Sequence, residues 1–328
     1  MSALTVTALH VRTDDGTPIV NDVSFTVAPG ERVGLIGESG SGKSVTALAI
    51  LGLLGEGLKA WGSVRLGDRE LIGQSDRVLA RLRGDDLAMV FQEPMTALNP
   101  LMRVGDQVAE VLRLHRGRSR SGSRAEAVQL LERVEMPEPA QRARSYPHQL
   151  SGGQRQRVML AMAIACDPAV LICDEPTTAL DVTVQARMLR LIDALVADRD
   201  TGLLFITHDL AVVSGLCQRV LVLYGGHIVE EGPTREVFAA PQHHYTAGLL
   251  ASSAATTDAS RRDARGRLPV VPGSVPGAGE FPSGCVFRTR CRAADAQCEQ
   301  VPPLEPIDTD AGSAVAPRRV ACWHPVPR

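Results

Sequence analysis

Apolar and polar residues alternate along the first part of the chain, in the way that half-buried strands require. The alternation runs from Leu4 to Val11, stops at the Asp15-Gly16 turn and resumes from Ile19 to Val27, which predicts an antiparallel pair of strands. Beyond Pro29-Gly30, the apolar run Arg32-Val33-Gly34-Leu35-Ile36 predicts a third, buried strand.

A long segment in the middle of the chain has apolar residues at three- and four-residue spacing instead. The pattern is clearest over Val104–Leu114 and Ala125–Val134, and it returns over Ser151–Ala165. This spacing predicts amphipathic helices, which together form a helical subdomain inserted at about residues 95–165. The basic stretch His115–Gly122 is predicted to be a solvated surface loop between the first two helices.

Elsewhere, short apolar runs alternate with helical stretches. The predicted strands are Asp86–Phe91, Val170–Cys173, Leu203–Thr207, Arg219–Tyr224 and His227–Glu230, and the predicted helices are Val45–Leu54 and Val182–Ala197. This alternation is typical of an α/β fold with a mostly parallel sheet. From Ala251 the sequence turns to small and polar residues with little periodicity, so a linker or loosely packed extension is expected there.

Composition narrows the classes of protein to which the chain can belong. Its 328 residues are 44% hydrophobic, 22% charged and 3% aromatic, which suits one large globular domain plus a smaller part. The net charge of −2 gives no electrostatic reason to expect nucleic acid or an anionic membrane surface as a partner. Apolar runs are shorter than the roughly 20 residues that span a bilayer, and no export signal opens the sequence. We therefore expect a soluble, cytoplasmic protein that reaches a membrane only through a partner.

The first chemical motif follows the predicted strand Arg32–Ile36 and opens a predicted helix. It reads Gly37-Glu38-Ser39-Gly40-Ser41-Gly42-Lys43-Ser44, with Val45 next. The glycines let successive backbone N–H groups approach a triphosphate. Lys43 would place a positive charge at the β- and γ-phosphates, and the Ser44 hydroxyl would bind magnesium. Because a strand precedes this loop and a helix follows it, residues 37–45 are predicted to bind a nucleotide.

Two carboxylates stand at the end of another apolar strand. Asp174 and Glu175 follow the run Val170–Cys173. Asp174 is expected to support the magnesium ion, directly or through its water. Glu175 is then placed to polarise the water that attacks the γ-phosphate.

Two more polar residues follow predicted strands. Gln92 comes directly after Phe91, where an amide can ligate magnesium and sense its presence. His208 follows Thr207 and is expected to hydrogen-bond the γ-phosphate and hold the attacking geometry.

A further motif, Leu150-Ser151-Gly152-Gly153-Gln154, lies between the helical segment and the acidic strand, and Ala179-Leu180-Asp181 follows that strand. In this order the motifs of residues 1–240 resemble the nucleotide-binding subunit of ATP-binding-cassette transporters. The resemblance implies an α/β fold with a P-loop (RecA-like) ATPase core, an antiparallel β subdomain, the inserted helical subdomain and a small cysteine-rich C-terminal extension. ATP and Mg²⁺ are the implied ligands.

The same resemblance implies that two cassettes dimerise head to tail. Ser151, Gly152, Gly153 and Gln154 would then act on the ATP bound by the partner, and Asp181 would communicate across the dimer. The physics is consistent, because Ser151 to Gly153 open a predicted helix whose free N–H groups and dipole favour an anion. Closure on ATP and reopening after hydrolysis would do mechanical work on attached membrane subunits.

The resemblance is more specific than the superfamily. Phe91–Pro100, Tyr146–Gly153, Asp174–Thr183 and His243–Leu250 look like the ATPases of dipeptide, oligopeptide and nickel importers. This implies an ATPase domain over 1–250 and an importer-type extension over 251–328. The implied partners are a second cassette subunit (a copy or a paralogue), two transmembrane permease subunits and, indirectly, an extracytoplasmic solute-binding protein. The chain would then sit at the cytoplasmic face of the inner (plasma) membrane, held there by the permeases.

Four of the seven cysteines, namely Cys285, Cys291, Cys298 and Cys322, crowd into the end of the chain. In a reducing compartment such a cluster points to a metal before it points to disulfides. The spacing is not that of common zinc sites, and four thiolates suit either iron–sulfur or zinc. Some members of the importer branch hold a [4Fe-4S] cluster on cysteines in matching motifs. The resemblance therefore implies a structural [4Fe-4S] cluster here, with zinc or no metal as the alternatives.

One departure from the family pattern concerns adenine. Members usually carry an aromatic residue near the first strand to stack on the base, but around Thr13 there is none, and Phe25 is the first aromatic residue. His10 or an apolar contact would have to replace it.

Two other functions disagree with the sequence, one because it needs features that the sequence lacks and one because it would lack a motif that is present. A non-transport cassette ATPase acting on DNA or ribosomes would carry a coiled-coil insertion or two cassettes. A P-loop kinase or GTPase would lack the motif Leu150–Gln154. Within the importers, nickel or another small solute is the alternative to peptides.

Overall fold

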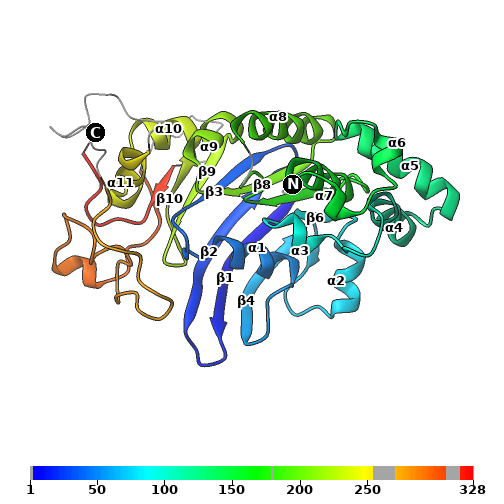
Figure 1. The fold of residues 1–328 in the computed structure, drawn as a ribbon. Coiled ribbons are helices and arrows are strands. Elements are labelled where there is room, and N and C mark those ends of the chain that lie inside the picture. Colours follow the sequence, from blue (N-terminus) through cyan, green and yellow to red (C-terminus); the bar gives the residue numbers. More distant parts are fainter. Residues whose placement is uncertain (1–2, 179–180, 254–269, 308–317, 328) are drawn as a thin grey trace. The chain divides into compact units, whose positions relative to one another are not determined.

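The structure is a computed structural model that describes residues 3–178, 181–253, 270–307 and 318–327. The chain forms two compact units. The first contains Met1–Leu4, Val27–Glu31 and Leu66–Leu204, and the second contains Thr5–Thr26, Arg32–Arg65 and Phe205–Arg328. Figure 1 shows the elements of both units, coloured along the sequence.

The first unit is mainly helical. Its helices are α2 (Asp76–Leu82), α3 (Pro94–Ala97), α4 (Val104–Arg116), α5 (Arg120–Arg133), α6 (Pro139–Arg142), α7 (Gly152–Ala163) and α8 (Val182–Asp198), with a 3-10 turn η1 at Pro147–Gln149 and a short strand β5 at Arg69–Glu70. Two strands, β6 (Leu87–Val90) and β7 (Val170–Asp174), pair in parallel with Val90 opposite Cys173. The α4 residues Val104, Val108 and Leu112 are fully buried, as their spacing predicts.

The second unit holds most of the N-terminal strands. β1 (Leu4–Thr13) lies between β2 (Pro18–Val27) and β4 (Leu58–Leu66). In a separate sheet β3 (Arg32–Ile36) pairs in parallel with β9 (Arg219–Tyr224), which pairs antiparallel with β10 (His227–Pro233). β8 (Gly202–Thr207) runs from the first unit into the second. The helices are α1 (Lys43–Leu51), α9 (Leu210–Leu216), α10 (Thr234–Ala239) and α11 (His244–Ser252).

The C-terminal residues join this second sheet. β12 (Arg319–Val320) pairs antiparallel with β10, and β11 (Glu305–Pro306) pairs with β12. A 3-10 turn, η3, covers Ala296–Glu299. The linker expected directly after Ala251 lies in residues 254–269, outside the described residues. Residues 318–327 are more firmly integrated than a loosely packed extension would be.

A buried ion pair anchors this junction. The Glu230 side chain on β10 is fully buried, and its carboxylate accepts a hydrogen bond from Arg318, whose side chain is 5% exposed, at 2.9 Å. The same carboxylate accepts the backbone N–H groups of Gln242 and His243, both at 2.9 Å. A buried carboxylate needs such partners because an uncompensated charge in the interior is costly.

Several elements differ from the sequence prediction, for local reasons. Helix α1 starts at Lys43 and ends at Leu51 because the glycines that flank it, Gly42 and Gly52, are left-handed, with φ of 101° and 64°. The predicted loop His115–Gly122 is mostly helical, since α4 continues to Arg116 and the Ser119 hydroxyl caps α5 by accepting the Gly122 N–H at 3.1 Å. Strand β4 and helices α2, α9, α10 and α11 were not predicted.

No helix in the described part of the chain combines the length and the apolar character that crossing a membrane requires.

Arg318→Ala should lower the free energy of unfolding of the chain by about 3–5 kcal/mol, because it leaves the buried Glu230 charge without its partner. Urea unfolding followed by circular dichroism measures the loss. Lys59→Ala is the control: Lys59 and Asp14 are paired at 2.8 Å, but their side chains are 67% and 61% exposed, so we expect less than about 1 kcal/mol. Equal losses in the two variants would show that the Glu230–Arg318 pair does not anchor the C-terminal residues.

Candidate functional site

The loop of residues 37–42 joins β3 to α1 in the second unit. A Cβ atom on Gly37 would lie 2.1 Å from the carbonyl oxygen of Leu223 on β9, and one on Gly42 would lie 3.1 Å from the carbonyl oxygen of Ile19. Neighbouring backbone therefore excludes a side chain at Gly37, whereas a side chain at Gly42 would be crowded and also strained, because φ there is +101°. The Gly226 N–H donates to the Ser41 carbonyl oxygen at 3.0 Å, which ties the loop to the turn between β9 and β10.

Lys43 is folded back over the loop. Its side chain is 6% exposed, and Nζ donates to the carbonyl oxygens of Gly37 and Glu38 at 2.8 and 3.0 Å. A glycine-rich loop that opens a helix, with a lysine ammonium beside it, suits an anion. Ser39, Gly40 and Ser44 are exposed. The residues predicted to contact ATP, 37–45, thus lie in one turn and the start of one helix.

In the first unit, the register of two parallel strands brings Gln92 to Glu175. Val90 of β6 is opposite Cys173 of β7, so the residues that follow each strand emerge at the same edge of the sheet. Gln92 Nε2 donates to Glu175 Oε2 at 3.2 Å. The sequence placed both residues at strand ends but gave no indication that they touch.

Glu175 has an unusual backbone conformation. Its φ is +45°, a region that residues other than glycine enter at some energetic cost and that is enriched at functional sites. The carboxylate also accepts a hydrogen bond from Thr178 Oγ1 at 3.0 Å. Asp174, one residue earlier, ends β7 and is 5% exposed. The conformation therefore turns Glu175 away from the course of the strand.

The motif that begins at Ser151 forms the N-terminus of α7. The Ser151 hydroxyl accepts the Gln154 N–H at 3.3 Å, and Gln154 Oε1 accepts the Ser151 N–H at 3.0 Å. This arrangement is a capping box. The two side chains therefore stabilise the start of α7 within this chain, whatever else they contact. The box engages the N–H groups of Ser151 and Gln154. It does not engage those of Gly152 and Gly153, which lie in the first turn, where N–H groups have no acceptor within the helix.

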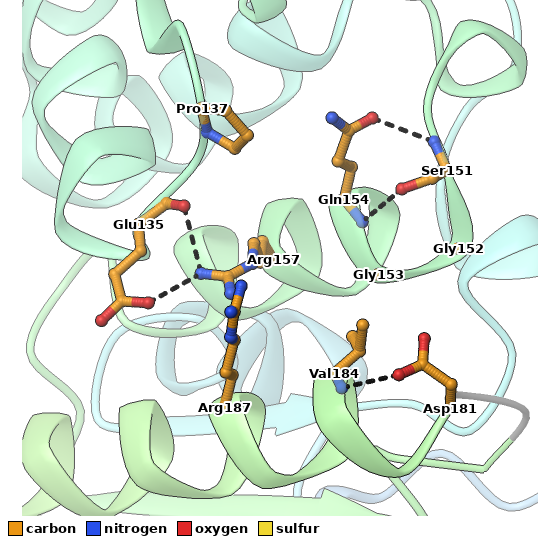
Figure 2. A pocket seen from close by; sticks show the side chains of 10 residues that line it. All are labelled: Glu135, Pro137, Ser151, Gly152, Gly153, Gln154, Arg157, Asp181, Val184 and Arg187. Atoms are coloured by element: carbon orange, nitrogen blue, oxygen red, sulfur yellow. Dashed lines mark hydrogen bonds and ion pairs between the residues drawn. The ribbon is translucent and has the colours of Figure 1, made fainter.

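The α7 N-terminus borders a cavity of about 500 Å³ in the first unit. Figure 2 shows its lining residues, Glu135, Pro137, Ser151, Gly152, Gly153, Gln154, Arg157, Asp181, Val184 and Arg187. Two cations that the sequence reading missed, Arg157 on α7 and Arg187 on α8, extend toward each other in this view. Arg157 donates to the backbone of Val134 and to both the backbone and carboxylate of Glu135. A helix N-terminus with two guanidinium groups nearby favours an anion.

Asp181 also has a structural role in the chain. Its carboxylate caps α8 by accepting the N–H groups of Thr183 and Val184 at 3.1 and 2.9 Å. Residues 179–180 of the same motif lie outside the described residues. Asp181 and the motif at Ser151 border the same cavity, although the sequence separates them by an entire strand.

His208 is exposed and follows the last residue of β8 in the second unit. Asp209, next to it, starts α9 by accepting the N–H groups of Ala211 and Val212 at 2.9 and 3.4 Å. The helix cap fixes the backbone at the end of the strand, and this holds His208 at the strand end as predicted.

Thiols from separate parts of the C-terminal region lie near enough to one another to raise one another's pKa. Burial, and to a smaller extent the neighbouring thiols of Cys285, Cys291 and Cys298, raise the pKa of Cys322 to about 11. The Cys285 N–H donates to the Cys298 carbonyl oxygen at 2.9 Å. Gly284, with φ of +76°, permits this approach because a Cβ there would lie 2.5 Å from the same oxygen.

The four sulfurs are not packed as tightly as ligands of a single ion. In a tetrahedral Zn–S₄ site with Zn–S bonds of about 2.3 Å, the sulfurs lie about 3.8 Å apart. Within the described ranges, the one group of three or more potential ligand atoms that all lie within 4.8 Å of one another is Asp295, Cys298 and His324. His324 Nε2 and Asp295 Oδ1 are 3.0 Å apart. The sequence reading had not included Asp295 or His324 among the ligands.

The aromatic residues on the strands beside β1 differ in how accessible they are to a base. Phe25 is 4% exposed, whereas Trp61 on β4 is 47% exposed. Nδ1 of His10 accepts the Asp22 N–H at 3.3 Å, so one edge of that ring is engaged.

Comparison with known protein families gives two matches. Residues 20–178 match the family described as ABC transporter, and residues 229–298 match the family described as the C-terminal region of oligopeptide/dipeptide transporters. The second match begins in β10 and includes three of the four clustered cysteines.

Individual proteins are similar over most of the chain. OppD of Salmonella typhimurium, an oligopeptide transport ATP-binding protein, is 46% identical over 315 residues, which cover 95% of this chain and 90% of OppD. An ATP-binding protein of Brucella melitensis, named for peptide import, is 50% identical over 303 residues, 90% of each chain. The solved dimeric structure of the ATP-binding cassette MJ0796 with ADP and Pi has a TM-score of 0.64 at 28% identity, covering 71% of this chain and 99% of that one. These similarities confirm the resemblance that the motifs predict.

Proposed function

The chain belongs to the ATP-binding-cassette transporter family, and we propose that it is the ATP-hydrolysing subunit of an importer for di- or oligopeptides. The observation that carries this proposal is the similarity to OppD, which extends through the C-terminal region. That region distinguishes the peptide-importer branch from cassettes that share only the ATPase core. ATP is the substrate and Mg²⁺ its expected companion.

The phosphate loop binds ATP in this proposal. Backbone N–H groups of residues 37–45, other than that of Glu38, would surround the triphosphate, and Lys43 would neutralise its β- and γ-oxygens. The buried Lys43 ammonium, already held by two loop carbonyls, is oriented before the nucleotide arrives. Such preorganisation reduces the entropy that binding costs.

Hydrolysis requires a metal and a base. Ser44, Gln92 and Asp174 are the proposed magnesium ligands, and Glu175 is the proposed general base for water attack. His208 would hydrogen-bond the γ-phosphate and hold that geometry. The contact of Gln92 with Glu175 supports a shared task for these two residues.

The cavity at the α7 N-terminus is the proposed contact with the ATP of a second cassette. Ser151, Gly152, Gly153 and Gln154 would face the partner's γ-phosphate, and Asp181 in the same cavity would carry the signal between the two sites. The MJ0796 cassette is dimeric in its solved structure, which supports such an arrangement. The second cassette is either a copy of this chain or a paralogue.

Two permease subunits, to which this chain binds at the cytoplasmic face of the inner membrane, complete the proposed transporter. A solute-binding protein would deliver the peptide on the other side. ATP-driven closure of the cassette dimer and its reopening after hydrolysis would move the permeases. Purification of the chain together with hydrophobic permease subunits, rather than with nucleic acid or ribosomes, separates this function from a non-transport cassette. Uptake assays separate peptides from nickel or another small solute.

We also propose that residues 251–328 form an extension to the ATPase domain of 1–250 and hold a [4Fe-4S] cluster on Cys285, Cys291, Cys298 and Cys322. Two observations support the fit: the thiols raise one another's pKa, and no three of the four sulfurs, which all belong to described residues, lie within 4.8 Å of one another, which agrees with ligands that each bind a different iron. When bound, the cluster would cross-link segments that are distant in sequence and have little regular structure.

Glu175→Gln should retain ATP binding but reduce turnover by at least about 100-fold, because an amide cannot accept the proton from the attacking water. Equilibrium binding of a fluorescent ATP analogue and release of phosphate are measured on the same preparation. Uptake of a labelled peptide by cells that carry the whole transporter should be lost in parallel. Wild-type turnover in this variant would refute the general-base assignment.

Gly152→Ala should leave the stability of the chain unchanged or raise it by up to about 1 kcal/mol, since Ala is the better helix former. A Cβ at this position meets no atom within 4 Å. Turnover should nevertheless fall at least about tenfold, because the methyl group enters the space proposed for the partner's γ-phosphate, while ATP affinity of the chain's own loop is retained. Gly55→Ala, which is equally unobstructed, is the control. Unchanged turnover in Gly152→Ala would argue against the partner contact.

Protein purified without oxygen should contain about four iron atoms per chain and absorb at about 400 nm through thiolate-to-iron charge transfer. Cys298→Ser should lose this iron, whereas Cys217→Ser should keep it, since Cys217 is buried elsewhere in the unit. A colourless protein with one zinc ion per chain, lost in Asp295→Asn, would assign the group Asp295–Cys298–His324 as the metal site instead.

A further inference from the structure

An arginine of the C-terminal extension contacts the phosphate loop directly. Both guanidinium ends of Arg290 bind the Glu38 carboxylate: Nη1 lies 2.7 Å from Oε2, and Nη2 lies 3.3 Å from Oε1. The Arg290 side chain is 5% exposed and that of Glu38 is 27% exposed. This bidentate geometry is the strong form of an arginine–carboxylate contact.

Arg290 is itself fixed in place by its surroundings. Nε donates to the Pro272 carbonyl oxygen at 2.7 Å, and Nη1 donates to the Tyr224 hydroxyl at 3.1 Å. The guanidinium carbon lies 5.7 Å from the centre of the Tyr224 ring and 5.8 Å from that of Phe287, within the range of cation–π attraction. The guanidinium therefore has little freedom to follow Glu38 if the loop moves.

Glu38 is held through its backbone as well. Its N–H donates to the Tyr245 hydroxyl at 2.7 Å, and its carbonyl oxygen accepts from Lys43 Nζ at 3.0 Å. The Tyr245 ring packs on Tyr224 at 4.5 Å between centroids. The N–H, the carbonyl oxygen and the side chain of Glu38 thus all form hydrogen bonds, and Arg290 is the partner of the side chain.

The charge of Glu38 makes this contact relevant to nucleotide binding. A carboxylate within a loop that surrounds a triphosphate repels the ligand unless a cation neutralises it. Arg290 supplies that cation from a direction that leaves the exposed residues Ser39 and Gly40 uncovered. The pair is partly buried, so salt screens it less than a surface pair.

We propose that Arg290 is a positioning residue for ATP, which orients Glu38 and cancels its charge so that the affinity of the phosphate loop depends on the folded C-terminal extension. This inference rests on the proposed function, because it requires that residues 37–45 bind ATP. The extension therefore contributes to the nucleotide site and is more than a covering of the sheet edge.

The test measures the Kd for a fluorescent ATP analogue on the full chain without magnesium, together with KM and kcat for ATP with magnesium. Arg290→Ala should raise the Kd at least about tenfold, equivalent to about 1.4 kcal/mol, and raise KM in proportion while kcat changes less than about twofold. Arg290→Lys keeps the charge but loses the fork and should give an intermediate Kd. Arg292→Ala, an exposed arginine on the other side of Cys291, should bind as the wild type does.

A double-mutant cycle decides whether Arg290 acts through Glu38. In a Glu38→Gln background, Arg290→Ala should change the Kd by less than about twofold. Independent, multiplying effects of the two substitutions, or a wild-type Kd in Arg290→Ala, would overturn the inference. If Arg290→Ala does not fold, the double variant Glu38→Gln/Arg290→Gln replaces it, because its two amides can stay in contact. Its Kd is then compared with that of Glu38→Gln alone. A wild-type chain that binds no ATP would refute the proposed function, and this outcome is distinct from an Arg290 effect that is absent.

Discussion

Backbone N–H groups at the start of a helix are the feature on which both proposed nucleotide surfaces of this chain depend. The first turn of a helix has no internal acceptor for these groups and carries about half a positive charge. Helix α1 begins after the left-handed Gly42 without a side-chain cap. Helix α7 begins with a capping box that engages Ser151 and Gln154 and leaves the glycines between them. In both places glycine residues leave the backbone N–H groups uncovered by side chains where an anion would approach.

Such N–H groups help binding only if the backbone that carries them is held still. In the phosphate loop the restraint comes from outside the motif: from the backbone of β9 at Gly37, from the β9–β10 turn at Ser41 and from the aromatic residues around Glu38. The chain has six Phe, three Tyr and two Trp, and two of the Tyr and two of the Phe meet at this point. The chain has few aromatic residues, and four of them lie where the C-terminal extension contacts the phosphate loop.

The sequence predicts correctly those helices and strands that are determined by neighbouring residues along the chain. The strands Arg32–Ile36 and Arg219–Tyr224 were predicted to the residue, because continuous apolar runs bounded by turn residues define a buried strand. Helix α5 begins earlier than predicted because its start depends on the Ser119 cap and not on hydrophobic periodicity. Strand β4 was missed because its burial is irregular, with exposed residues such as Trp61 in sequence with buried ones.

Contacts between distant segments could not be predicted in the same way. Arg290 and Glu38 are 252 residues apart, and neither residue type is unusual in its own segment. The same holds for Arg157 and Arg187, which periodicity assigns to two unrelated helices and which only the packing of α7 and α8 brings to one cavity. Motifs predict which residues carry chemistry, whereas only the structure reveals which distant residues contact them.

The pairing of Gln92 with Glu175 gives a physical reason for an amide at position 92. A carboxylate there would bind magnesium at least as well, but at hydrogen-bond distance from Glu175 the two negative charges would repel, and one would take up a proton. An amide has two different ends: Nε2 donates to Glu175 at 3.2 Å, and Oε1 stays available for a metal. The assignment of the two ends follows from the hydrogen bond itself, since Glu175 can only accept when it is ionised. In the proposed mechanism a single side chain would therefore contact both the base and the metal, and the position of one would depend on the presence of the other.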